Sequence, residues 1–247
     1  MVDKPTRKER ERIARSDLFL DIARSVVKHE GFHELSMNRI AEIAEYSKGT
    51  IYLHFPSREM VLMSLCQRGL GTWQGLVDAV CTSELNTLEK LIGLHWAQQI
   101  YAALHPVEYD ALFLVQASSI REKITKEAHA SLNGEIDRMV QNLTAVVDHA
   151  VDVGEIVLPS DMTAASLGRD LWQMLAQPRS PDETAALMPA GISDPGHPGD
   201  RAILLRTLYR GLNGSLADDQ TAFSNQLIDV RDRLFEKEMS KLNRLAQ

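Results

Sequence analysis

The chain has 247 residues, of which 44% are hydrophobic and 25% charged, a balance typical of a globular protein rather than a disordered or fibrous one. Twenty-seven Lys and Arg stand against 34 Asp and Glu, giving a formal net charge of −7, which argues against a general nucleic-acid coat protein because such proteins are basic throughout. The charged residues 1–17 contain no apolar core of a signal peptide. No stretch approaches the ~18 apolar residues of a membrane span. We therefore expect a cytoplasmic protein without membrane contact.

Apolar residues recur at helical spacing along most of the chain. Residues 13–30 carry such a stripe, and Gly31 follows as a suitable helix end. Further helical stretches are predicted at 58–82, 86–104, 107–121, 125–153, 160–176, 201–214 and 221–246. No run of two-residue alternation is long enough to predict a strand. The sequence thus predicts an all-α fold.

Residues 177–200 interrupt this helical pattern. They hold five of the nine prolines, and proline is excluded from helix interiors because it lacks the N–H donor and clashes with the preceding turn. A loop of this length is uncommon within a compact domain. We interpret it as a mobile surface insertion, with a lid or a loop that binds a protein partner as the alternatives.

Three serines mark helix starts in close succession between Leu35 and Leu62. Ser36, Ser47 and Ser57 are each suited to cap a helix. Their spacing predicts two short helices separated by about three residues, with a third packed after them. This is the helix-turn-helix arrangement, whose second helix enters the DNA major groove. Residues 46–58 contain two basic residues and no acidic one, as expected of a segment that approaches phosphates.

The same segment resembles the DNA-binding signature of the TetR family of bacterial transcriptional regulators. The resemblance rests on the runs Ser47-Lys48-Gly49-Thr50-Ile51-Tyr52, His54-Phe55 and Ser57-Arg58-Glu59 and covers about residues 13–65. It implies a homodimer with a three-helix DNA-binding domain at 1–65 and a larger helical domain at 66–247 that binds a small-molecule effector and dimerises. It further implies a repressor, not an enzyme, that leaves a palindromic DNA operator when the effector binds.

Nine residues are the predicted DNA contacts. The resemblance implies that the helix start at Ser36 meets a phosphate and that Lys48 and Thr50 face bases or backbone. It also implies that phosphates are contacted by Tyr52, His54 and Arg58. Leu53 is our own inference, as an apolar contact to a thymine methyl group. The full set is Ser36, Ser47, Lys48, Gly49, Thr50, Tyr52, Leu53, His54 and Arg58.

Two residues depart from the family pattern in the turn before the recognition helix. Glu45 stands where the family usually has glycine, and Tyr46 where it has an aliphatic residue. A non-glycine residue at positive φ costs on the order of 1 kcal/mol. We therefore expect a strained turn at Glu45, with an anion close to the operator.

The N-terminal residues add a basic segment with two interpretations. Flexible basic arms commonly enter a minor groove or contact phosphates, whereas a charged terminus can also simply confer solubility. The basic residues are Lys4, Arg7, Lys8, Arg10, Arg12 and Arg15.

The C-terminal region is expected to bind the effector and to dimerise. Residues 86–121 mix aromatic and neutral polar side chains, the usual lining of an organic-ligand pocket, which favours an apolar or aromatic effector. The predicted lining residues are Trp96, Gln99, Phe113, Gln116 and Trp172. Residues 160–176 and 221–246 are the predicted dimer contacts. The stripe on 221–246 is strongly amphipathic, able to pack on its own domain or on a partner.

Other chemistries are weakly supported. His29-Glu30-Gly31-Phe32-His33 satisfies the zinc-protease pattern, but that chemistry needs one continuous helix, and Gly31 is expected to end the helix. Cys66 and Cys81, if both lie in one helix, are ~22 Å apart and cannot form a disulfide; Cys66 is expected in the core. No metal or cofactor is predicted. The alternative function is a DNA-binding dimer without an effector, whose C-terminal domain binds a protein partner.

The acidity of the chain is unevenly distributed. Residues 1–72 carry a balance of +2 and residues 73–247 a balance of −9. The segment predicted to contact DNA is therefore the more basic part of an acidic protein, which is compatible with reading one short operator.

Overall fold

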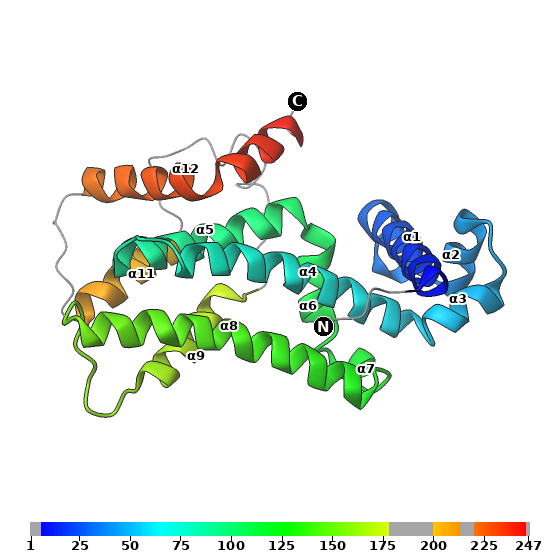
Figure 1. Ribbon diagram of the computed structural model, residues 1–247, viewed down its shortest axis with the longest axis horizontal. Coiled ribbons are helices and arrows are strands. Elements are labelled where there is room, and N and C mark those ends of the chain that lie inside the picture. Colours follow the sequence, from blue (N-terminus) through cyan, green and yellow to red (C-terminus); the bar gives the residue numbers. More distant parts are fainter. Residues whose placement is uncertain (1–5, 178–199, 213–219, 246–247) are drawn as a thin grey trace. The chain divides into compact units, whose positions relative to one another are not determined.

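The computed structural model describes residues 6–177, 200–212 and 220–245, and the regular structure within these ranges is helical, without strands (Figure 1). The predicted all-α fold is confirmed. The chain divides into two compact units, one of Met1–Leu70 with Val107–Leu132 and one of Gly71–Pro106 with Asn133–Gln247. Within the described ranges, no helix has the length and apolar character needed to cross a membrane. Most of the proline-rich segment, 178–199, lies outside the described residues.

The first unit contains the predicted helix-turn-helix. Its elements are α1 (Arg7–Glu30), the short 3₁₀ helix η1 (Phe32–Glu34), α2 (Met37–Ala44), α3 (Lys48–His54), the start of α4 (Arg58–Cys81), α6 (Pro106–Leu114), α7 (Ser118–Arg121) and the start of α8 (Lys126–Asp152).

Helix α1 begins six residues earlier than the sequence predicted. The Thr6 hydroxyl accepts a hydrogen bond from the Glu9 N–H, and the Thr6 N–H donates to the Glu9 carboxylate at 2.6 Å. This capping box satisfies two backbone donors at the helix start. The interpretation of residues 7–15 as a flexible arm is therefore wrong: Arg7, Lys8, Arg10, Arg12 and Arg15 lie on a helix, while Lys4 lies outside the described residues.

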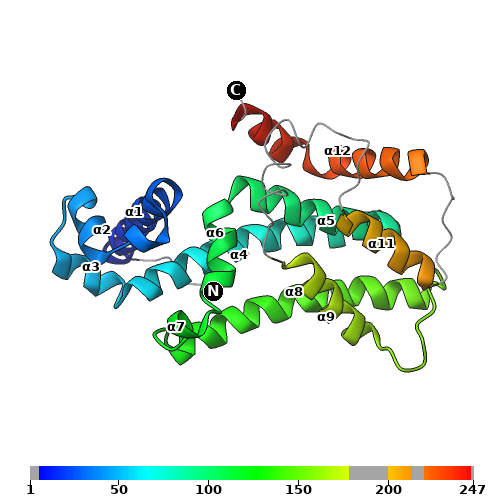
Figure 2. The same cartoon turned by 180° about the vertical axis from the view of Figure 1, so that it is seen from behind.

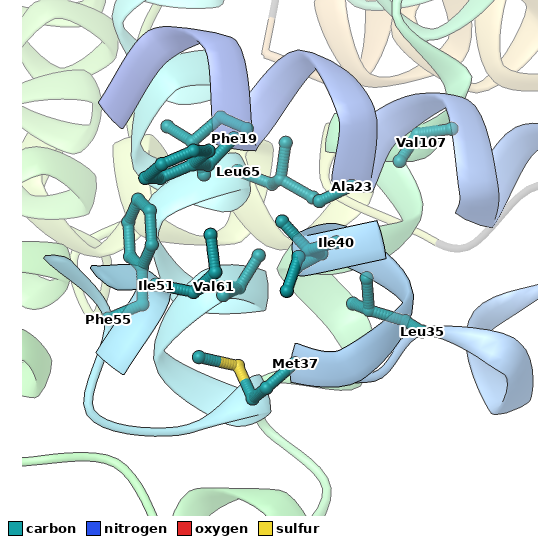
Figure 3. Close-up of a cluster of buried hydrophobic side chains, with 12 residues drawn as sticks. Phe19, Ala23, Leu35, Met37, Ile40, Ile51, Phe55, Val61, Leu65 and Val107 are labelled. Atoms are coloured by element: carbon teal, nitrogen blue, oxygen red, sulfur yellow. The ribbon is translucent and has the colours of Figure 1, made fainter. Parts of the chain in front are cut away.

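A single apolar cluster holds the helices of the first unit together (Figure 3). It joins residues of α1, α2, α3, α4 and α6, and α3 contributes Ile51, which is fully buried, with Phe55 just after its end. The cluster consists of Phe19, Leu20, Ala23, Leu35, Met37, Ile40, Ala41, Ile51, Phe55, Val61, Leu65 and Val107. Because Val107 is a member, a residue far along the chain helps to form this core.

The single helix predicted at 107–121 is wrong, since the structure divides it into α6 and α7. At the end of α6 the backbone tightens, and the Gln116 N–H donates to the Phe113 carbonyl at 3.2 Å. The Gln116 side chain donates to the Leu112 carbonyl at 2.9 Å, which satisfies an acceptor that a continued helix would have used. Ala117 is extended, with ψ 133°, and α7 begins after it.

Helix α5 (Thr87–Leu104) lies at the centre of the second unit and is buried over most of its length. Helices α11 (Asp200–Gly211) and α12 (Gln220–Leu245) both pack against α5 (Figures 1 and 2). The Trp96 indole N–H donates to the Leu227 carbonyl at 2.9 Å, joining α5 to α12. Part of the apolar stripe of α12 is thus buried within its own chain.

Helix α12 has a kink at Phe235, where φ is −127° and ψ is 28°. In the sequence the apolar stripe on this helix runs through Leu234 and resumes at Met239 after a skip. The kink and the skip coincide, and Phe235 itself is buried. The irregular spacing in the sequence therefore corresponds to a real change of helix direction.

Candidate nucleic-acid interface

Serine side chains start both helices of the helix-turn-helix. The Ser36 hydroxyl accepts from the Arg39 N–H at 3.1 Å, and the Ser47 hydroxyl accepts from the Thr50 N–H at 3.1 Å. Ser47 and Thr50 also share a hydrogen bond between their hydroxyls at 2.8 Å. These side chains are therefore used in capping. What remains for a phosphate at each helix start is the backbone N–H groups not satisfied by the cap.

The turn between α2 and α3 contains the strained residue that the sequence predicted. Glu45 has φ 56° and ψ 36°, and it is the one non-glycine residue with positive φ among the described residues. Tyr46 follows, and its ring meets the buried Phe19 ring edge to face, with centroids 5.3 Å apart. The second departure from the family pattern thus makes a specific contact with α1.

Glu45→Asn is expected to stabilise the protein by about 0.5–1 kcal/mol, because asparagine adopts the left-handed conformation more readily than glutamate. The measurement is urea unfolding followed by circular dichroism. The control is Glu42→Asn, which removes the same charge from an exposed position within α2. There we expect a loss of a few tenths of a kcal/mol from lower helix propensity. Equal effects at the two positions would contradict the assignment of strain to Glu45.

Helix α3 buries one face and exposes the rest. Ile51 is fully buried, whereas Lys48 and Gly49 are exposed and Tyr52 is 42% exposed. The Lys48 ammonium lies 5.8 Å from the centroid of the Tyr52 ring. Leu53 is 80% exposed, an unfavourable position for leucine in water that is consistent with its predicted apolar contact to DNA.

Arg58 lies at the start of α4, on the predicted phosphate-contacting side. Its guanidinium carbon is 5.1 Å from the centroid of the Phe32 ring, and one of its nitrogens is 3.7 Å from the buried Glu59 carboxylate. Lys123, which follows α7, approaches the same carboxylate at 3.4 Å. The Glu59 carboxylate therefore partly neutralises the charge of Arg58. Lys123 adds a second positive charge beside the same carboxylate.

His54, the last residue of α3, is half-buried and faces α1. Its Nδ1 atom lies 2.7 Å from the Ser16 hydroxyl oxygen, and its ring meets the Phe19 ring edge to face at 5.2 Å. Burial, and then the positive charges of Arg15 and Arg12, lower the pKa of His54 from its usual value. Phe19 thus contacts Tyr46, which precedes α3, and His54, the last residue of α3.

Sequence reasoning missed an ionic cluster that ties α6 to the helices of the first unit. The Glu108 side chain is only 4% exposed, and its Oε1 atom lies 2.8 Å from Arg24 of α1 and 3.5 Å from Arg68 of α4. Arg68 also contacts Asp21 at 2.7 Å. A buried carboxylate of this kind requires cationic partners. No local pattern in the sequence connects residues so far apart.

The histidines of the zinc-protease pattern and the two cysteines lie in the region from α1 to α4. Gly31, with φ 91°, ends α1 between His29 and His33, and His33 falls in η1. The two histidines therefore do not share a continuous helix. Cys66 and Cys81 are both free thiols in α4; Cys66 is fully buried, as predicted, and burial raises the pKa of Cys81 to about 11.

The five predicted effector contacts fall in two different units. Trp96, Gln99 and Trp172 belong to the second unit, where the Trp172 ring lies 5.0 Å from the buried Trp73 ring. Phe113 and Gln116 belong to the first unit. On α5, Gln98 is fully buried while Gln99 is half-buried. Gln98 was not predicted, although it continues the helical spacing of Leu91 and Leu94. The effector contacts stay predictions.

Comparison with known proteins identifies the helix-turn-helix part of the first unit. Residues 19–64, which include α2 and α3, match the family model described as bacterial regulatory proteins, tetR family. The resemblance to the TetR family predicted from the sequence is confirmed over this segment. That family consists of DNA-binding transcriptional regulators and not of enzymes.

Among sequence relatives, this chain is similar to the fatty acid metabolism regulator protein of Bacillus subtilis (strain 168). The two are 31% identical over 72 residues, which are 29% of this chain and 37% of that protein. The match therefore spans less than two fifths of the relative's length.

Two solved structures share the fold of this chain over most of its length. The fatty acid degradation regulator FadR from Bacillus halodurans has 20% identity and a TM-score of 0.56, with 87% of this chain and 98% of that chain covered. AibR, solved with isovaleryl coenzyme A and operator DNA, has 15% identity and a TM-score of 0.53, with 80% and 97% covered. At these identities the likeness concerns the fold.

Proposed function

We propose that this protein is a TetR-type transcriptional repressor that binds a palindromic operator as a homodimer in the bacterial cytoplasm. The observation that carries the proposal is helix α3, which anchors Ile51 in the core and leaves Lys48, Gly49, Tyr52 and Leu53 exposed at its surface. A short exposed helix with a cation in its first turn suits the major groove. The nine predicted contacts, Ser36 to Arg58, are the residues proposed to meet DNA.

The proposed effector is a molecule with an apolar acyl chain, either the free acid or its coenzyme A thioester. The support comes from relatives: the names of two similar proteins refer to fatty acid metabolism or degradation, and AibR was solved with isovaleryl coenzyme A. In the mechanism, binding favours a conformation whose recognition helices no longer match the groove spacing. Trp96, Gln99, Phe113, Gln116 and Trp172 are the proposed contacts.

The proposed dimer uses α9 (Ala164–Leu175) and α12. Because part of the apolar stripe of α12 is buried on α5, the partner would contact the faces of these helices that remain outside this packing. Two-fold symmetry of the dimer requires a two-fold symmetric operator. The form of the protected DNA site therefore tests the dimer as well as DNA binding.

Footprinting of the DNA upstream of the protein's own and neighbouring genes is expected to show a protected palindrome. Titration with oleic acid, isovaleric acid or their coenzyme A thioesters should then release this DNA with at least one of the four compounds and, in the free protein, change the fluorescence of the three tryptophans. Weak, sequence-independent and salt-sensitive protection would contradict the operator. Protection of a palindrome that neither the free acids nor their thioesters release would contradict the effector class and leave the DNA-binding function standing.

A further inference from the structure

The two ring nitrogens of His54 have different surroundings. Nδ1 is 2.7 Å from the Ser16 hydroxyl of α1. Nε2 has no hydrogen-bond partner among the described residues. It is also not among the side-chain nitrogen and oxygen atoms there that are buried without a partner. It is therefore accessible to solvent at the C-terminal end of the recognition helix. One nitrogen is fixed by the protein and the other is available to a ligand.

The hydrogen bond to Ser16 matters because a neutral imidazole carries a single N–H. A serine hydroxyl can donate or accept, so the partners of both nitrogens together determine which nitrogen bears the hydrogen, and a phosphate at Nε2 can only accept. When the Ser16 hydroxyl donates to Nδ1, the hydrogen resides on Nε2. That is the tautomer which can donate to a phosphate oxygen, whereas the other tautomer would present a lone pair to the phosphate.

The charges around His54 suit the same ligand. Arg15 and Arg12 of α1 are the charged groups that act on the imidazole, and together with burial they lower its pKa. The ring is therefore neutral near pH 7, where the choice of tautomer matters. The same two guanidinium groups attract a phosphate to this end of α3.

We propose that Ser16 is a positioning residue of the DNA interface, whose hydroxyl holds neutral His54 in the tautomer that donates from Nε2 to a DNA phosphate beside Arg12 and Arg15. This inference rests on the DNA-binding function proposed above. In acid, both ring nitrogens carry a hydrogen, and the Ser16 oxygen then accepts from Nδ1. The choice of tautomer no longer exists, so the contribution of Ser16 to tautomer selection disappears.

The test is Ser16→Ala, measured by fluorescence anisotropy on a labelled random-sequence duplex of about 30 base pairs at low salt, because phosphate contacts do not depend on sequence. At about pH 8 the variant is expected to bind about fivefold more weakly than the wild type, the value of one hydrogen bond. The pKa of His54 lies below its usual value, so the second measurement is made at the acidic pH at which the imidazole NMR signals show His54 protonated, and there the loss should shrink toward twofold or less. Ser16→Thr keeps the hydroxyl and should bind like the wild type at both pH values.

Two controls separate positioning from folding. Ser25→Ala removes a hydroxyl from an exposed position on the same helix and should leave binding unchanged. In a His54→Ala background, Ser16→Ala should have no further effect, since the two residues act as a pair. A loss of equal size at both pH values would show that Ser16 only supports the fold and would overturn the inference. Failure of the wild type to bind any duplex would instead refute DNA binding, and the inference with it.

Discussion

Gly168→Ala is expected to destabilise the protein by about 2–3 kcal/mol, because the added methyl group has no space between α8 and α9. A Cβ atom at this position would lie 2.9 Å from the Thr144 backbone nitrogen and 3.0 Å from its Cα, and it would also overlap the Thr144 hydroxyl. That hydroxyl donates to the Val140 carbonyl at 2.9 Å, so it is held in place by its own helix. The measurement is the midpoint of urea unfolding, followed by circular dichroism.

A matched control lies on α8 itself. Gly134 is exposed, and a Cβ built there meets no atom within 4 Å. Gly134→Ala should therefore stabilise the protein by about 0.5–1 kcal/mol through helix propensity. The double variant Gly168→Ala/Thr144→Ala should recover only part of the loss, since the backbone of α8 still obstructs the methyl group. If both single alanine variants stabilised the protein, the close packing of α8 and α9 would be refuted.

Arg24→Met is expected to cost about 2–3 kcal/mol of unfolding free energy, because it leaves Glu108 buried with Arg68 as the remaining cation. The Glu108 side chain is 4% exposed, and Arg24 provides the shorter of its two ion pairs. Arg24 is itself 34% exposed, which keeps the expected loss below that of a fully buried pair. Thermal and urea unfolding of the full chain would both report the loss.

The control variants for Arg24→Met change other residues of the ionic cluster around Glu108. Asp21→Asn removes an ion pair to Arg68 whose carboxylate is 68% exposed, and it should change stability by less than about 0.5 kcal/mol. The double variant Arg24→Met/Glu108→Met removes both charges and should recover most of the loss. If Arg24→Met lowered the free energy of unfolding no more than Asp21→Asn, the stability of the protein would not depend on the ion pair between Arg24 and the buried Glu108.

The local features of the helix-turn-helix could be predicted because their causes are local. Capping by Ser36 and Ser47 depends on residues three positions away, and the strained turn at Glu45 depends on the residue itself. The helix end at Gly31 has the same origin. In each case the short-range geometry of the backbone selects the residue type, so a single sequence contains the needed information.

Features formed by residues distant in the sequence could not be predicted. The pairing of Ser16 with His54, and of Arg24 with Glu108, arises only when helices pack, and periodicity does not specify which residues meet. Helix α1 was predicted too short because residues 7–12 lack an apolar stripe, although the capping box at Thr6 and Glu9 was visible in the sequence. The division of 107–121 into α6 and α7 likewise depends on a side-chain bond from Gln116.

The recognition helix α3 has only seven residues, about 10 Å at the rise of an α-helix. With successive base pairs about 3.4 Å apart, that length faces about three of them. Two copies in the proposed dimer would then inspect about six base pairs, which distinguishes about 4,000 sequences among the millions of competing sites in a genome. The rest of the information needed to find one promoter must therefore come from other features, such as the distance between half-sites and the shape of the DNA between them.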